Sequence, residues 1–119
     1  MSYVDGFIVP VPKSKLDAYR DMSVKCGNIW RELGALDYRE YVADDVKTGK
    51  FTSFPQSVDL KEDEVVVFSY IVYTSREERD RINEAVMQDP RMKDMMDPES
   101  MPFDGKRLIY GGFDKLVEL

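Results

Sequence analysis

The sequence contains no histidine and only one cysteine. Histidine is the most frequent general base near neutral pH and the most frequent ligand of transition metals, so neither kind of chemistry is expected. A single cysteine cannot form an internal disulfide, which favours a reducing compartment. We therefore expect a cytoplasmic protein without a metal or any other cofactor.

The chain also lacks an excess of positive charge and a long apolar run. It has 17 basic and 23 acidic residues and a net charge of −6, whereas nucleic-acid-binding proteins usually present a basic face to phosphate groups. Its longest apolar run, around Val65–Tyr73, is too short to cross a bilayer, and the N-terminal residues do not resemble a signal peptide. We expect no nucleic-acid partner and no membrane partner.

Four segments have the residue pattern of β-strands: Tyr3–Val11, Leu36–Ala43, Glu64–Thr74 and Lys106–Tyr110. In the first and third, apolar residues occupy both alternating faces, so we expect these strands to be central and covered on both sides. Pro10 and Pro12 are expected to end the first strand.

Two helices are expected between the strands. The longer one, Lys15–Leu33, has apolar residues at helical spacing. Ser14 and Asp17 match a capping box at its start, and Gly34 is a typical residue after a helix end. Cys26 lies on the apolar stripe of this helix, so we interpret it as a buried, unreactive thiol.

The second helix is expected to begin at Ser75 and to end before Pro90, because the residue preceding a proline avoids helical geometry. Pro90 can then open a short further helix rich in methionine. Residues 44–63, between the second and third strands, form a connection long enough to be a lid or a binding loop.

These elements follow the order β-α-β-β-α-β, which is the order of the ferredoxin-like fold. We predict a single α+β domain, residues 1–119, whose four-stranded antiparallel sheet carries both helices on one face. The other face of the two central strands is apolar and needs a cover. A second copy of the chain would supply it, so we predict a homodimer paired through the sheet face.

The segment Met101–Phe113 combines a turn, a strand and two adjacent glycines. Asp104-Gly105 is a turn signal, and the strand Lys106–Tyr110 follows it. Gly111 and Gly112 leave no side chain above the sheet, so another group is expected to lie close to the backbone there.

Three segments resemble those of a known family: Tyr3-Val-Asp-Gly-Phe7 with Val9-Pro-Val-Pro12, Ile29–Ala35, and Met101–Phe113. They are similar to the YbaA-like family, domain of unknown function 1428, over nearly the whole chain, and the last segment is the most specific. The resemblance implies a dimeric α+β barrel related in fold to small cofactor-free monooxygenases and stress-response barrel proteins. It implies no established activity. Some members of the family carry a label connected with signal-recognition RNA. The acidic charge of this chain argues against taking that label as evidence of RNA binding.

We predict a ligand cavity where the long loop, the methionine-rich segment and the glycine pair meet, because these features suit a ligand site. Polar strand residues that face away from the helices, with Glu40 among the candidates, would line it. The weak catalytic candidates are Asp5 and Tyr70. The predicted binding residues are Phe51, Phe54, Met95, Met96, Arg107, Gly111 and Gly112.

Two apparent motifs are set aside. Lys47-Thr-Gly-Lys50 lacks the glycine and the hydroxyl residue that a phosphate-binding loop requires. Asp44-Asp45 and the pair Asp94 and Asp97 lack the spacing of a known Mg²⁺ or Ca²⁺ loop.

Three functions therefore stay open. The first is the binding of a small apolar or aromatic molecule between sheet and loop. The second is a cofactor-free oxygenase or isomerase that acts on a phenolic or enolisable substrate, with Asp5 or Tyr70 near the chemistry. The third is a protein-interaction module that uses the methionine-rich segment.

Overall fold

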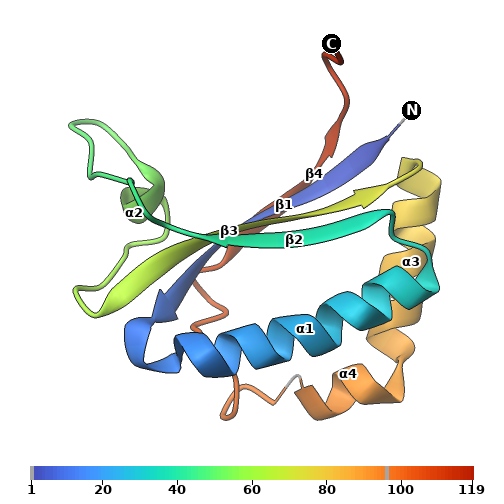
Figure 1. The fold of residues 1–119 in the computed structure, drawn as a ribbon, viewed down its shortest axis with the longest axis horizontal. Coiled ribbons are helices and arrows are strands. Elements are labelled where there is room, and N and C mark those ends of the chain that lie inside the picture. Colours follow the sequence, from blue (N-terminus) through green and yellow to red (C-terminus); the bar gives the residue numbers. More distant parts are fainter. Residues whose placement is uncertain (1, 96) are drawn as a thin grey trace.

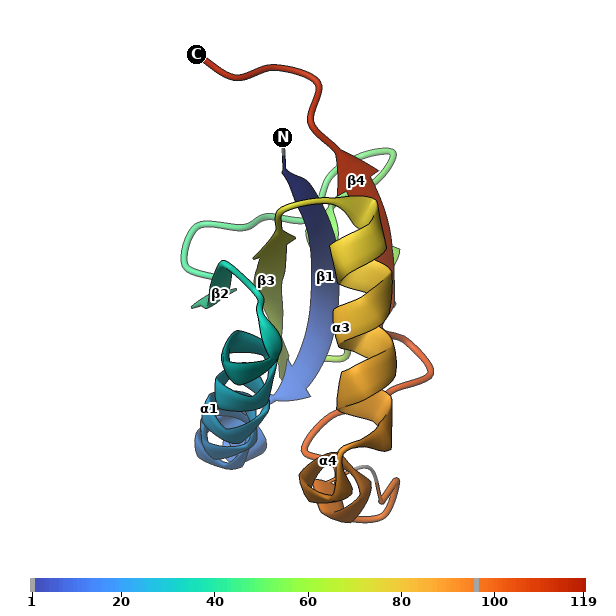
Figure 2. The same cartoon turned by 90° about the vertical axis from the view of Figure 1, so that its right-hand side faces the viewer.

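A computed structural model describes residues 2–95 and 97–119 of the chain. These residues form one antiparallel sheet of order β2-β3-β1-β4, with α1 and α3 against one face (Figures 1 and 2). The elements are β1 (Tyr3–Pro12), a short 3-10 turn η1 (Lys13–Lys15), α1 (Leu16–Leu33), β2 (Asp37–Val42), α2 (Phe54–Ser57), β3 (Glu64–Tyr73), α3 (Arg76–Gln88), α4 (Pro90–Met95) and β4 (Ile109–Asp114). The predicted ferredoxin-like order and the central position of the first and third strands are confirmed.

The strand register determines which side chains face the helices. β1 pairs with β3 from Tyr3 opposite Tyr73 to Pro12 opposite Glu64, so residues of the same parity share a face. The odd-numbered residues of both strands pack against α1 and α3 in two apolar clusters. Their even-numbered residues form the opposite face, which we call the open face. The odd-numbered residues of β2 and β4 also lie on the open face, because they pair with even-numbered residues of β3 and β1.

The start of α1 differs from the prediction. The capping box expected at Ser14 and Asp17 is not formed, because Ser14 lies inside η1 and the N-cap position falls to Lys15 without a side-chain hydrogen bond. The helix ends as predicted, since Gly34 has a φ of 125° that favours glycine and its N–H bonds to Arg31 and Trp30 carbonyls.

The second half of the chain begins its helices where the sequence indicates. The Ser75 hydroxyl accepts a hydrogen bond from the Glu78 N–H at 3.1 Å and caps α3. Asp89 has an extended backbone, which ends α3, and Pro90 then opens α4.

Pro10 does not end β1, contrary to the prediction. It lies within the strand, opposite Val66 of β3. β4 reaches only to Ile8, so the remainder of β1 is an edge on that side. A missing N–H costs no sheet hydrogen bond when it points to such an edge.

β4 is also displaced from its predicted position. It spans Ile109–Asp114, so Gly111 and Gly112 lie within the strand. A Cβ on Gly112 would lie 2.4 Å from the Tyr3 hydroxyl oxygen and 2.8 Å from an Arg79 guanidinium nitrogen. The group that approaches this bare backbone is therefore a pair of the protein's own side chains.

Candidate functional site

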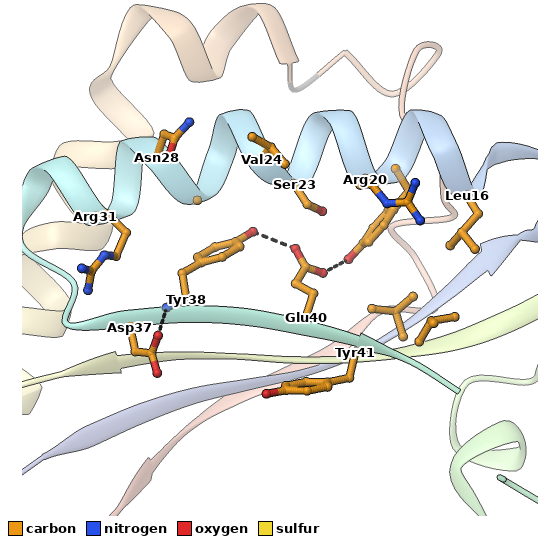
Figure 3. Close-up of a pocket in the computed structure, with 14 residues that line it drawn as sticks. Leu16, Arg20, Ser23, Val24, Asn28, Arg31, Asp37, Tyr38, Glu40 and Tyr41 are labelled. Carbon is orange, nitrogen blue, oxygen red and sulfur yellow. Dashed lines mark hydrogen bonds between the residues drawn. The ribbon is translucent and has the colours of Figure 1, made fainter. Parts of the chain in front are cut away.

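A groove of about 560 Å³ runs between α1 and β2 on the helix-bearing side of the sheet. Figure 3 shows α1 residues along one wall, from Leu16 to Arg31, and β2 along the other. Leu16, Val42 and Val67 make one part of the lining apolar, while polar side chains converge around Glu40. Because apolar walls with a few convergent polar groups are typical of ligand sites, this groove is the candidate functional site.

The Glu40 carboxylate accepts hydrogen bonds from two tyrosines. Tyr38 lies two residues earlier in β2, on the same face, and its hydroxyl donates to Oε2 at 2.9 Å. Tyr19 comes from α1, and its hydroxyl donates to Oε1. Among the described residues, no cationic side chain forms an ion pair with Glu40. The arrangement is therefore a carboxylate oriented by two phenols.

Both tyrosines remain hydrogen-bond donors at physiological pH. Burial raises the pKa of the Tyr19 and Tyr38 hydroxyls far above the ordinary value, and the negative charge of Glu40 and its hydrogen bonds add to the rise. A carboxylate has about four acceptor positions, so Glu40 can still accept a hydrogen bond from another molecule.

A glycine in the middle of α1 makes room for this arrangement. A Cβ on Gly27 would lie 2.8 Å from the Tyr38 ring, closer than carbon atoms normally approach. The other side of the ring is fixed by contact with Trp30, at 6.1 Å between ring centroids. Gly27 thus allows Tyr38 to lie under α1 with its hydroxyl at Glu40.

Ser23 and Cys26 complete the buried side of α1 near the groove. The Ser23 hydroxyl oxygen is the one buried side-chain polar atom without a hydrogen-bond partner among the described residues. Burial first, and the charge of Glu40 second, raise the pKa of the Cys26 thiol to about 11. Cys26 is therefore a protonated, unreactive thiol at neutral pH, in line with its position on the apolar stripe.

Asp5, a predicted catalytic candidate, faces the helices and not the open face. It is 3% exposed. Its carboxylate accepts hydrogen bonds from Tyr73 (2.9 Å), Arg79 (3.0 Å) and Asn83 (3.2 Å). These partners hold α3 against the sheet, and the carboxylate is enclosed by them.

Tyr70, the other catalytic candidate, lies on the open face. Its ring stacks on that of Tyr41, with 6.2 Å between ring centroids and 17° between planes. Gly111 lies on the same face, where a shallow apolar groove of about 260 Å³ is bordered by Gly6, Phe68 and Phe113. Tyr70 and Gly111 are therefore separated by the sheet from the Glu40 groove.

Arg107 connects the long loop to the sheet. Its guanidinium donates to both oxygens of Glu64, at 2.8 and 2.5 Å, and to the carbonyl oxygens of Val58 (3.1 Å) and Asp59 (3.0 Å). The exposed fraction of the side chain is 16% for Arg107 and 4% for Glu64. Arg107 therefore has a structural role, because its hydrogen bonds attach the long loop to the start of β3.

The remaining predicted binding residues do not come together, so the cavity expected between the three segments is not formed by the described residues. Phe51 and Phe54 are exposed near α2, and Met95 packs against the core from α4. Figure 1 places α2 and α4 at opposite ends of the molecule. Met96 lies outside the described residues.

Glu40 is one of the polar strand residues considered from the sequence. The cavity, however, was expected on the sheet face that points away from the helices. The signal that could have located the groove is that Tyr38 and Glu40 share one face of β2. This face is turned toward the helices because the two residues pair with Ile71 and Ser69 of β3. Within residues 2–95 and 97–119, no three acidic or cysteine side chains gather where a metal could bind, and no helix there is long and apolar enough to span a membrane.

Comparison with known proteins identifies the family. A family described as "Protein of unknown function (DUF1428)" matches residues 2–105. The uncharacterized protein YbaA of Escherichia coli strain K12 is 52% identical over 118 residues, covering 99% of each chain, and YbaA of Shigella flexneri has the same values. Two solved structures share the fold. Rv0793 from Mycobacterium tuberculosis has a TM-score of 0.53 and 13% identity, covering 99% of this chain and 98% of its own. The de novo designed protein Foldit4 has a TM-score of 0.50 and 11% identity, covering 98% of this chain and 100% of its own. This chain belongs to the DUF1428 family, the family that its three sequence segments resemble.

Proposed function

We propose that this protein binds a small, largely apolar or aromatic molecule in the groove between α1 and β2. The observation that supports this most directly is Glu40, a carboxylate that two tyrosines orient, at a groove of suitable size; no cationic side chain in the described part of the chain pairs with it. The volume of about 560 Å³ falls within the range of small-molecule sites. The ligand site therefore lies between sheet and helix, and not between sheet and loop.

The bound molecule places a hydrogen-bond donor on Glu40 and its apolar part against Leu16, Val42 and Val67. The two tyrosines fix the direction of the carboxylate before the ligand arrives. A preoriented acceptor improves binding because less conformational freedom is lost when the complex forms.

Screening of aromatic fragments by two-dimensional NMR of labelled protein tests this proposal. Binding in the groove shifts the amide signals of Ser23, Gly27 and Glu40. Glu40→Gln removes the charge and weakens the binding of donor-bearing fragments, whereas Glu84→Gln, on the exposed face of α3, leaves it unchanged. Fragment shifts confined to the open face, or binding indifferent to Glu40→Gln, would contradict the proposal.

A second candidate is a cofactor-free oxygenase or isomerase, and one observation favours a particular base for it. Asp5 is enclosed by three partners and Tyr70 lies on the other side of the sheet. Of the two carboxylates that line the groove, Asp37 is paired with Arg39, which leaves Glu40. A general base must lie within hydrogen-bond reach of the proton it removes. In this candidate, Glu40 takes the role that the sequence had suggested for Asp5. Exchange of an enolisable fragment's α-proton with deuterium, lost in Glu40→Gln, is its test.

We also propose that two copies of the chain pair through their open faces, in the cytoplasm and without nucleic acid. Phe68, Ile109 and Phe113 are 47%, 44% and 63% exposed on this face. A contiguous apolar area of this kind is larger than a monomer usually leaves in water. A two-fold pairing covers it with one self-complementary surface and leaves the Glu40 groove, on the other face, accessible. A stable pairing buries about 800 Å² per subunit.

A further inference from the structure

The charges that border the groove restrict the class of ligand further than its shape does. Arg20 and Arg31 line it from α1, on either side of Ser23 along the helix (Figure 3). Arg20 has only a long contact of 3.4 Å with Asp17, and these two side chains are 70% and 94% exposed. Arg31 donates to the carbonyl oxygens of Ala35 and Leu36. Both of these bonds use Nη1 of Arg31, so the exposed Arg20 guanidinium and the remaining N–H groups of Arg31 can interact with a ligand.

The acidic groups in the lining do not offset this positive border. Asp37 is paired with Arg39 at 3.0 Å. The charge of Glu40 lies deeper, where the Tyr19 and Tyr38 hydroxyls already donate to it. A ligand that carries a cation would approach two guanidinium groups, whereas an anionic group at the rim would be attracted by them.

The inner part of the groove has the opposite requirement. The Glu40 carboxylate accepts hydrogen bonds and repels an anion, so the part of the ligand beside it needs to be an uncharged hydrogen-bond donor. Ser23, whose hydroxyl has no partner among the described residues, points from α1 toward Glu40 (Figure 3). The hydroxyl is buried, and a turn to another staggered position about χ1 would direct it into the groove. A ligand hydroxyl satisfies both residues, because it donates to Glu40 and accepts from Ser23.

We propose, resting on the function proposed above, that the ligand is an aromatic hydroxy acid. Its phenolic hydroxyl lies between Glu40 and Ser23, its ring lies against the apolar wall, and its carboxylate lies at the rim beside Arg20, at the Leu16 end of the groove. This polarity, with the neutral donor inside and the anion outside, follows from which charged groups are enclosed and which are exposed.

Four naphthalene probes separate the two ends of the ligand. They are 6-hydroxy-2-naphthoate, 6-methoxy-2-naphthoate, 2-naphthol and 2-methoxynaphthalene, titrated into the full chain by calorimetry or NMR. A hydrogen bond to a charged group is worth about 1.5–3 kcal/mol, so each hydroxyl probe should bind at least about 10-fold tighter than its methoxy counterpart. A partly exposed ion pair adds up to about 5-fold for the acids, and added salt removes that part.

Two variants assign the ends to residues. Ser23→Ala should weaken only the hydroxyl probes, by about 2- to 10-fold, and the paired change Arg20→Gln with Arg31→Gln should weaken only the acids. Ser57→Ala in α2 and Arg76→Gln in α3 are matched controls outside the groove, with no expected effect.

The results distinguish this inference from the broader proposal. Equal binding of hydroxyl and methoxy probes in the groove, or tighter binding of 2-naphthylmethylammonium than of the acids, would overturn the ligand class and leave the site intact. Failure of every probe to bind at millimolar concentration would count against the groove as a ligand site, and with it against the ligand class.

Discussion

Gly27→Ala is expected to destabilise the protein, although alanine is the better helix former. In a helix interior, alanine is favoured over glycine by about 1 kcal/mol. Here the new Cβ would lie 2.8 Å from the Tyr38 ring, which Trp30 and the hydrogen bond to Glu40 hold in place. Overpacking of this kind costs about 1–3 kcal/mol, and displacement of the ring also weakens a charge-assisted hydrogen bond. The expected net effect is a loss of about 2 kcal/mol.

The same change should have the opposite sign once Tyr38 is removed. In a Tyr38→Ala background nothing opposes the methyl group, so Gly27→Ala should stabilise by the helix preference of about 1 kcal/mol. The coupling between the two positions is then about 3 kcal/mol, which is large for a pair in direct contact. Lys25→Ala, at an exposed position of the same helix, is the control for a change of residue without contact with Tyr38.

Urea unfolding of the four members of this cycle measures the coupling, with the slope of each transition checked for constancy. If Gly27→Ala stabilises the protein equally with and without Tyr38, the ring does not occupy the space above Gly27. The account of how Tyr38 reaches Glu40 would then be wrong.

Three further predictions concern other parts of the molecule. Phe68→Asp on the open face should convert the expected dimer into a species of single-chain mass, 13.8 kDa, in sedimentation, and a wild-type protein that already sediments at that mass at micromolar concentration would refute the pairing. Arg107→Met should cost about 3 kcal/mol at pH 7, because it leaves the Glu64 carboxylate buried without its partner. Hydrogen bonds from Arg107 hold the pKa of Glu64 below its ordinary 4.5, so this stabilisation is present above pH 4.5 and is lost as the pH falls through the lowered pKa. The bonds of Arg107 to the Val58 and Asp59 carbonyl oxygens do not titrate, so a difference from wild type as large at pH 2 as at pH 7 would contradict the ion pair. Cys26, with its pKa raised to about 11, should react slowly with iodoacetamide at pH 8 and faster as the pH approaches 11, and rapid labelling of folded protein at pH 7 would show that the thiol is accessible.

The sequence was sufficient for the fold because its periodic signals agree with one another. Apolar residues on both parities of Tyr3–Val11 and Glu64–Thr74 indicated two central strands, and β1 and β3 are central. The displaced β4 shows where local rules fail. Glycine weakens a strand in isolation, but Gly112 is required beneath Tyr3 and Arg79, a contact between distant parts of the chain.

The candidate site was harder to predict because its polar groups come from two elements. Tyr19 and Ser23 appear in the sequence as part of a helix stripe, and Glu40 as one charge among several on a strand. Their meeting depends on the position of α1 over β2, which no local pattern specifies. Gly27, in the middle of an otherwise regular helix, was the one local sign that a large side chain lies close to α1.

The pairing of β1 has a consequence for how the chain reaches this structure. β1 is synthesised before the other described elements, yet the pair nearest in sequence joins Pro12 to Glu64 and the most distant pair joins Tyr3 to Asp114. Every hydrogen bond of this strand to a neighbour must therefore close a loop that contains α1 and β2. Topologies with such non-local contacts fold in the range of milliseconds to seconds, slower than helical bundles. During synthesis, the central strand remains unpaired until β3 has emerged, and its second edge is paired only after β4 has emerged.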